Sequence, residues 1–507
     1  MLLNTAATGA GNVWTILLTL VAVPALLAGL GPEAFGLWAL LQTFSAVSGW
    51  LSLGDLGLTT ASTRFVAEKA AVDDDPAIDR LIGTSLLLYT GLALAGGVLL
   101  AVVGLLAFPT LFEVPEDLAA AFGVAIVATA AQTVADQVNR GVQSALEGLQ
   151  RVDLSRGLEA ARKTLTIVAA VITAALTGDL GRVAVASLAG SVIALGLSVL
   201  VLQRHRSLWS LRFDREAAST LIAYGRTIAV LRPLGVIHRT MDRLLVGVLL
   251  GPSSVAIVEI AAQIQNGAMA LMSASAYSVI PSASWIKGRG DRPKLRDLAM
   301  TGSRYTTLLT VPAALIPALL IGPLLSVWIG PEGATAAVPA VLLLTYTCVG
   351  SPLQVGSELL VGVGRAGAVL RAAALAIVVN LAASLLLIGP LGLNGVFVAT
   401  IISATVLFPV LGRAILAEIE VPLRPFMDEV VAPVLRPTLL LAIGVAGVLA
   451  LGLNDLPTVV LGAAVGGLAY AIGVWRTALL PEEQDGLRRL LRRAVPGSSG
   501  VSRVATP

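Results

Sequence analysis

Long apolar runs alternate with short polar segments along most of the chain, and this pattern predicts membrane-spanning helices. A helix needs about 20 mostly apolar residues to cross the ~30 Å hydrocarbon core of a bilayer. Runs of this length predict fourteen spans, near residues 9–29, 34–57, 81–107, 118–140, 160–178, 182–202, 220–249, 254–281, 303–329, 335–361, 368–388, 393–412, 432–453 and 457–478. The predicted fold class is an all-α polytopic membrane protein.

Composition supports this class and excludes several others. The 507 residues are 56% hydrophobic and only 13% charged, whereas a soluble domain carries about 25% charged residues. One cysteine, Cys348, and two histidines exclude a disulfide framework and a cysteine or histidine metal site. The basic residues are scattered through short loops, so no nucleic-acid partner is expected. The first apolar run lacks a charged segment before it, which favours a retained helix over a signal peptide.

Charge sorts the predicted loops into two alternating sets. One set contains almost only acidic or neutral residues, with Arg182 as its single cation, and the other is basic. The basic loops carry Arg64, Lys69 and Arg80; Arg151, Arg156, Arg162 and Lys163; Arg204, Arg206, Arg212 and Arg215; Lys287, Arg289, Arg292, Lys294 and Arg296; Arg365; Arg413 and Arg424; and the arginines of the tail. The positive-inside rule predicts that this set and both termini are cytoplasmic.

One predicted span, residues 219–251, contains charges that a lipid-facing helix should not have. These are Arg226, Arg232, His238, Arg239, Asp242 and Arg243. Loops of opposite type flank the stretch, which predicts one crossing, and Pro233 predicts a kink or break where the arginines begin. Arg232, Arg239 and Arg243 fall within about 40° of one another on a helix. Because a cation costs at least ~2.5 kcal/mol at membrane depth, they should face a wet cavity or partner charges.

An internal repeat divides the chain. LAGLGPEAFGLWALLQ at 27–42 resembles LVGVLLGPSSVAIVEIAAQ at 245–263, and two further pairs recur at offsets of 214 and 212 residues. Transporters built from repeats place substrate between their halves near the midplane. The predicted organisation is an N-lobe of helices 1–6 (1–215), a C-lobe of helices 7–12 (216–425), helices 13–14 (426–480) and a cytoplasmic basic tail, amphipathic or disordered (481–507).

Polar residues inside the other spans are the remaining site candidates. Helix 4 carries one stripe, and helix 1 a milder one around Asn12; each either lines a substrate path or joins helices together. The helix-4 stripe consists of Gln132, Asp136, Asn139, Arg140 and Gln143. Asp55, Asp136, Glu259 and Glu358 are the candidates for ion coupling, since a buried carboxylate can carry a proton. The position of Asp55 near a cytoplasmic helix end favours gating or structural pairing instead.

Several stretches resemble the polysaccharide or oligosaccharide flippases (Wzx-type) of the MATE-like, or MOP, transporter superfamily. They are LGPEAFGLWAL, LGDLGLTTASTRFVAE, ALEGLQRVDLSR, MDRLLVGVLLG and VNLAASLLLIGPLGLNGVFVATIIS, in order over about the first 410 residues. One departure is Glu259, where the family often has an aromatic residue.

The resemblance implies an alternating-access flippase rather than an enzyme, with no cofactor or metal, in a plasma (inner) membrane of bacterial type. Such proteins move an undecaprenyl-diphosphate-linked oligosaccharide to the outer leaflet, with membrane lipids and glycan polymerases or glycosyltransferases as expected partners. Arg232, Arg239, Arg243 and Arg226 are the candidates for the diphosphate, because a guanidinium makes bidentate, charge-assisted hydrogen bonds. Structural pairing with a carboxylate is the competing interpretation. A lipid II (MurJ-type) flippase, a MATE-type multidrug or cation antiporter and a membrane scaffold remain alternative functions.

Overall fold

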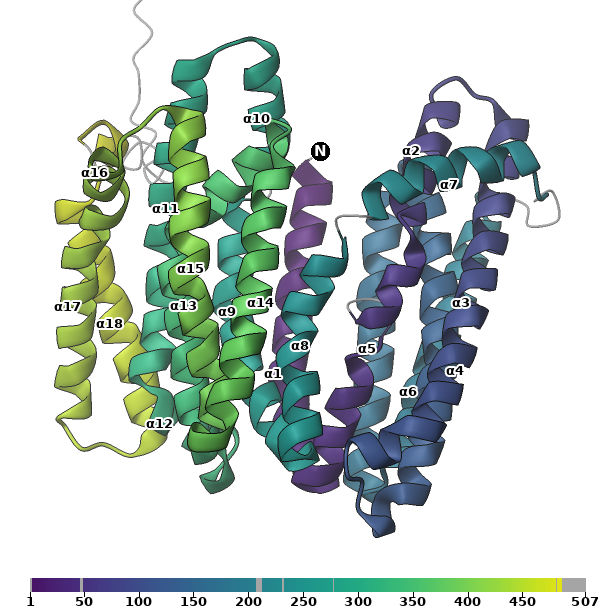
Figure 1. Cartoon of the computed structure of the whole chain (residues 1–507), viewed down its shortest axis with the longest axis horizontal. Coiled ribbons are helices and arrows are strands. Elements are labelled where there is room, and N and C mark those ends of the chain that lie inside the picture. Colours follow the sequence, from purple (N-terminus) through teal and green to yellow (C-terminus); the bar gives the residue numbers. More distant parts are fainter. Residues whose placement is uncertain are drawn as a thin grey trace, which may run out of the picture. The chain divides into compact units, whose positions relative to one another are not determined.

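The computed structural model describes residues 2–45, 49–206, 212–229, 232–276, 278–479 and 481–485. Within these ranges, the side chains of 2–13, 227–229, 232, 234, 238, 239, 275 and 276 are outside the description. The described chain is helical and contains no strand (Figure 1). Its elements are α1 (Leu2–Gln42), η1 (Trp50–Asp55), α2 (Leu58–Ala70), α3 (Asp75–Leu111), α4 (Glu116–Gly148), α5 (Val152–Thr177), α6 (Leu180–Gln203), α7 (Arg215–Ala229), α8 (Arg232–Leu250), α9 (Pro252–Ala276), α10 (Val279–Gly288), α11 (Arg292–Leu319), α12 (Ile321–Trp328), η3 (Pro331–Ala336), α13 (Ala337–Gly362), α14 (Ala366–Leu391), α15 (Leu393–Ile419), α16 (Leu423–Phe426), η4 (Met427–Val431), α17 (Ala432–Leu449) and α18 (Asp455–Thr477).

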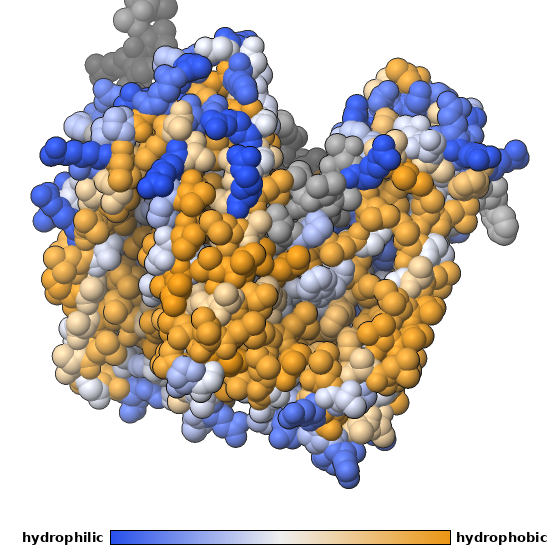
Figure 2. All heavy atoms as spheres, in the orientation of Figure 1, coloured by the Kyte–Doolittle hydropathy of each residue, from blue (hydrophilic) through white to orange (hydrophobic). Residues whose placement is uncertain are grey.

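Eleven of the described helices are long and apolar enough to cross a membrane, or twelve if the bent pair α11–α12 counts as one span. In each of the two parts drawn in Figure 2, apolar side chains form the middle and polar side chains gather at both ends. This distribution is that of a multi-pass membrane protein, because the apolar band is the surface that lipid covers. The all-α membrane class is confirmed, and the number fourteen stays a prediction.

Two of the predicted spans, 34–57 and 220–249, match none of these long apolar helices. Each lies where the helix is interrupted. Residues 9–29 and 34–57 fall on α1 and η1, and α1 is itself two helices joined at Gly31, whose φ of 78° and ψ of 166° are not helical. Residues 220–249 are divided between α7 and α8, which agrees with the break expected near Pro233. In Figure 1, α7 lies across the ends of α2 and α3, whereas α8 runs alongside α1.

The chain forms two compact units that interleave in sequence. Unit 1 consists of residues 1–263 and 370–406, and unit 2 of residues 264–369 and 407–507. Unit 1 therefore contains α1–α8, and the residues that follow are shared between the units. The predicted division into an N-lobe, a C-lobe and a C-terminal helix pair, with boundaries after residues 215, 425 and 480, stays a prediction. The basic part of the predicted tail (486–507) is outside the described residues.

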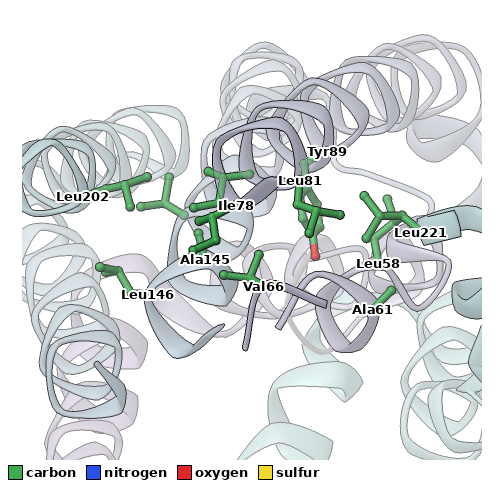
Figure 3. Packing of buried hydrophobic residues seen from close by; sticks show 12 residues of the cluster. Leu58, Ala61, Val66, Ile78, Leu81, Tyr89, Ala145, Leu146, Leu202 and Leu221 are labelled. Atoms are coloured by element: carbon green, nitrogen blue, oxygen red, sulfur yellow. The ribbon is translucent and has the colours of Figure 1, made fainter. Parts of the chain in front are cut away.

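One part of the unit 1 core lies where α2, α3, α4, α6 and α7 converge. Figure 3 shows the side chains that meet there, among them Leu58, Ile78, Tyr89, Leu146 and Leu221. Each of these five is almost completely inaccessible to solvent, and burying a large apolar side chain contributes about 1.5–3 kcal/mol. This cluster fixes α7 to the helices of unit 1.

The LGDLGL sequence forms the turn between η1 and α2. Leu56 and Gly57 both adopt left-handed backbone conformations, with φ of 45° and 77°. Gly57 lies so close to α7 that an added Cβ would stand 2.3 Å from the carbonyl oxygen of Gly225, and a Cβ on Gly225 would stand 2.6 Å from the carbonyl oxygen of Leu56. Glycine is required at both positions for space, and at Gly57 also for conformation.

In unit 2, the pair α17–α18 packs on α11. Their shared core includes Leu308, Val434, Leu441 and Tyr470, and the Tyr470 hydroxyl donates a hydrogen bond to the Leu308 carbonyl oxygen at 3.0 Å. The helix pair is therefore an integral part of unit 2.

Candidate substrate site

Among the described side chains of the charged helix α8, one forms an ion pair with the next helix. The Arg243 guanidinium Nη2 lies 2.5 Å from Glu259 Oε2 on α9, and the two side chains are 21% and 15% exposed. Arg243 precedes Gly251 by eight residues and Glu259 follows it by eight. Gly251, with φ of 79°, makes the turn between the helices, so both residues lie about 12 Å from it and face each other at one depth.

Asp242, the residue before Arg243 on α8, faces α15 rather than α9, since successive residues are about 100° apart around a helix. Asp242 Oδ2 accepts a hydrogen bond from the Thr400 hydroxyl of α15 at 3.5 Å. The Asn380 side-chain amide of α14 donates to the same hydroxyl at 3.1 Å, and Thr400 also contacts the carbonyl oxygen of Val396 at 3.2 Å. Asp242 is therefore part of a group of polar side chains from the three helices α8, α14 and α15.

The helix-4 stripe leads to a buried arginine on α5. Arg162 Nη1 lies 3.2 Å from Asp136 Oδ1, while its Nε and Nη2 donate to both carboxylate oxygens of Glu159 at 2.9 and 2.8 Å. The side chains of Arg162 and Asp136 are 7% and 6% exposed. The Gln143 amide donates to Glu159 at 3.4 Å. Among the predicted stripe residues, Asp136 and Gln143 are thus brought together through α5.

The remaining polar residues of the helix-4 stripe differ in their burial. Asn139 is buried and its side-chain atoms have no hydrogen-bond partner among the described residues. Gln132 and Arg140 are half-buried.

The other predicted residues lie in separate places. Asp55 Oδ1 accepts hydrogen bonds from the backbone N–H and the hydroxyl of Thr59 at 3.0 and 2.8 Å, at the start of α2. Glu358 accepts from the Gln354 amide on its own helix at 3.1 Å. Arg226 is an exposed residue of α7. The side chains of Asn12, Arg232 and Arg239 are outside the described part of the structure.

Three important residues were not recognised from the sequence. Arg162 and Glu159 follow the loop charges Arg151 and Arg156, so the pattern groups Arg162 with the cytoplasmic loops although it is buried in α5. Thr400 was not singled out because a hydroxyl in an apolar run is usually bonded to its own helix. The spacing Glu159–Arg162, an i,i+3 pair on an expected span, is the signal that would have found the first group.

Comparison with known families decides what kind of protein carries these groups. The profile of a family described as polysaccharide biosynthesis proteins matches residues 27–333, which is more than half of the chain. The chain belongs to this family. The match confirms the resemblance to polysaccharide flippases that the sequence motifs indicated. No curated protein matches the chain significantly.

Solved structures agree with this family in fold. A lipid II flippase MurJ in an inward closed conformation has a TM-score of 0.66 at 13% identity, over 97% of this chain and 100% of its own. An inward-facing MATE family multidrug transporter of the MOP superfamily has a TM-score of 0.63 at 16% identity, over 80% and 96%. An outward-facing MATE family multidrug transporter of the MOP superfamily has a TM-score of 0.55 at 18% identity, over 82% of this chain and 94% of its own. At these identities the likeness shows the fold, which is that of MOP transporters.

Within the polysaccharide biosynthesis family, the departure at Glu259 now has a physical explanation. The carboxylate at this position pairs with Arg243. An aromatic residue there would leave the guanidinium without this partner, because it offers no ionised oxygen. The arginine and the acid therefore act as a pair in this chain.

Proposed function

We propose that this protein moves a polyprenyl-diphosphate-linked oligosaccharide from the cytoplasmic to the outer leaflet by alternating access, for envelope or exopolysaccharide biosynthesis. Membership of the polysaccharide biosynthesis family and a MOP transporter fold support a flippase. The observation that carries the choice of an anionic headgroup is Arg243, a cation about 12 Å along α8 from its turn with a single described carboxylate partner. The setting we propose is an inner membrane, with both termini cytoplasmic.

In this proposal, Glu259 is the counter-ion of Arg243 when no substrate is present. A guanidinium has five N–H donors, and one carboxylate uses at most two or three of them. A diphosphate offers several charged acceptors and would share or replace Glu259 at the guanidinium. No covalent bond changes during translocation, so the proposed activity is transport and requires no catalytic group.

Further predicted residues complete the proposed substrate path. Arg232, Arg239 and Arg226 would add cations at other depths, and Gln132 and Asn12 would hydrogen-bond sugars. Glycan polymerases or glycosyltransferases would consume and supply the substrate.

The direct test is translocation in reconstituted vesicles. Vesicles with the protein should move a fluorescent polyprenyl-diphosphate oligosaccharide across the bilayer faster than protein-free vesicles. The same oligosaccharide on a monophosphate carrier is the matched control, and we expect slower movement because it offers fewer charged acceptors. Equal rates for vesicles with and without the protein, across several glycans, would refute the proposal.

A lipid II flippase is the second candidate. The MurJ structure aligns with 97% of this chain, including the C-terminal helix pair, whereas the MATE structures align with 80–82%. Lipid II has the same polyprenyl-diphosphate part, so the same vesicles with labelled lipid II discriminate the two candidates by relative rate. A MATE-type exporter is tested by uptake of a cationic dye, which Arg243 would disfavour by charge repulsion.

Asp242 is the coupling residue that we propose in addition to Asp55, Asp136, Glu259 and Glu358. Its described partners are neutral, and the oxygens of Thr400 and Val396 nearby suit a proton or a small hard cation. We expect Asp242→Asn to translocate at the basal rate but to lose stimulation by an imposed proton or sodium gradient. Stimulation equal to that of the wild type would remove Asp242 from this role.

A further inference from the structure

A cavity opens beside the short helix α10 of unit 2. Its volume is about 430 Å³, and it is lined by Pro281, Ser282, Trp285, Ile286 and Lys294 from α10 and the first turn of α11. Three of these five side chains are apolar or aromatic and two are polar. The Trp285 indole is exposed. Tryptophan is enriched where the bilayer meets water, because its ring is apolar and its N–H is polar.

The opposite side of α10 is fixed to α13 and is not available to a ligand. The Ser284 hydroxyl donates to the carbonyl oxygen of Gly362 at 2.7 Å, and Lys287 donates to the carbonyl oxygen of Val363. An added Cβ on Gly362 would stand 2.6 Å from the carbonyl oxygen of Ile280. The helix is therefore anchored, and the cavity lies on its outer side.

The rim of the cavity has a cation with unused hydrogen-bond donors. The Arg289 guanidinium carbon lies 3.9 Å from the centre of the Trp285 ring, in a cation–π contact. No hydrogen bond or ion pair of Arg289 occurs in the described part of the chain. Stacking holds the plane of the guanidinium but leaves its N–H groups at the edge, where they can bind a planar or tetrahedral anion.

Two neighbouring cations of this segment are already paired with acids. Arg292 pairs with Glu420, and Lys294 Nζ lies 2.9 Å from Asp291 Oδ2. Hydrogen bonds from Lys294 hold the pKa of the Asp291 carboxyl below its ordinary value, and the charge of Arg289 acts in the same direction. Asp291 is thus ionised at neutral pH and neutralises Lys294, so the cation next to Trp285 that an incoming ligand can bind is Arg289.

We propose that this cavity binds an anionic glycerophospholipid, with the phosphate on Arg289 and the glycerol and first acyl carbons beside Trp285 and Ile286. An apolar hollow next to a cation suits a lipid better than a free anion, which would gain nothing from the indole and isoleucine. Basic pockets at the ends of membrane helices bind anionic headgroups for the same reason. The loop charges predict that this end faces the cytoplasmic leaflet.

Native mass spectrometry of the purified full chain tests the site with phosphatidylglycerol as the probe. We expect the wild type to retain one phosphatidylglycerol in preference to phosphatidylcholine. Arg289→Gln should weaken this retention at least about tenfold, since it removes charge-assisted hydrogen bonds. Arg289→Lys should lose less, and Trp285→Leu should weaken retention of both lipids.

Arg296→Gln is the matched control, because Arg296 is an exposed arginine of the neighbouring helix α11 and has no described cation–π contact with Trp285. We expect a loss of less than about twofold for this variant. Equal losses for Arg289→Gln and Arg296→Gln would overturn the proposal in favour of diffuse attraction. Displacement of the lipid by equimolar glycerol phosphate would also overturn the proposal, because it would show a site for free anions. Unchanged melting of the lipid-free variants establishes that the differences come from binding.

Discussion

Arg162 and Arg243 are both arginines inside the membrane part of unit 1, yet their surroundings differ. Arg162 contacts two carboxylates with three of its nitrogen atoms, and its side chain is 7% exposed. Arg243 has one carboxylate partner and is 21% exposed. A buried cation whose three nitrogen atoms all contact carboxylates joins helices, whereas a cation with fewer contacts and access to solvent can take a ligand. The number of engaged donors therefore separates a structural arginine from a candidate binding arginine.

In the Arg162 group, which consists of Arg162, Asp136 and Glu159, the acids are also well supplied with partners. Glu159 accepts bonds from Arg162 and Gln143, and Lys163 lies 3.9 Å from it. Removing one member leaves the others charged and without solvent. Removing Glu259 beside Arg243 leaves a more exposed charge, which water can partly satisfy.

The largest effect is expected from Arg162→Met. This change leaves Asp136 and Glu159 buried without their cation, and breaking a buried pair in this way costs about 3–5 kcal/mol. We expect little folded protein, measured as detergent-soluble yield and melting temperature. The triple variant Arg162→Met, Asp136→Asn, Glu159→Gln should recover most of the yield, because no unpaired charge remains. A single variant that melts like the wild type would contradict a structural role.

The second effect is expected from Arg243→Ala, which should fold but translocate about tenfold to a hundredfold more slowly, as one charged hydrogen-bonding group is lost. The measurement is the translocation rate in vesicles, with melting temperature as the folding control.

Glu259→Gln is the matched variant for this position. It removes the counter-ion and keeps the arginine, so translocation should persist. If Glu259→Gln abolishes translocation while Arg243→Ala preserves it, the acid rather than the cation is the functional member of the pair.

The smallest effect is expected from Lys163→Gln. Lys163 is one residue from Arg162 but is 33% exposed and lies 3.9 Å from Glu159. Such a partly solvated pair contributes at most about 0.5–1 kcal/mol. We expect a melting temperature close to that of the wild type. A loss as large as that of Arg162→Met would show that position in the sequence, rather than the number of engaged donors, determines the effect.

Much of the fold was predictable because it follows from hydropathy and local motifs. Apolar runs identified the membrane helices, Pro233 marked the division between α7 and α8, and the motifs gave the family. The count of spans was less predictable. A single residue such as Gly31 divides α1, and α7 is charged enough to lie across helix ends instead of crossing.

The site was less predictable, because ion pairs join residues far apart in sequence. Hydropathy identified Arg243 and Glu259 separately. A carboxylate was already one of the expected partners of Arg243. Hydropathy did not identify Arg162, since an arginine a few residues after a loop looks the same whether it turns toward water or toward Asp136. That choice depends on packing between α4 and α5, which a single sequence does not record.

The contact between Gly57 and Gly225 affects how mutational scans of this protein should be interpreted. Any side chain at either position meets a carbonyl oxygen of the opposing segment within 2.6 Å. Both positions would therefore appear intolerant to every substitution, as ligand-binding residues do. Sensitivity there measures the approach of two backbones, so a substrate path mapped from sensitivity alone would wrongly include the η1–α2 turn.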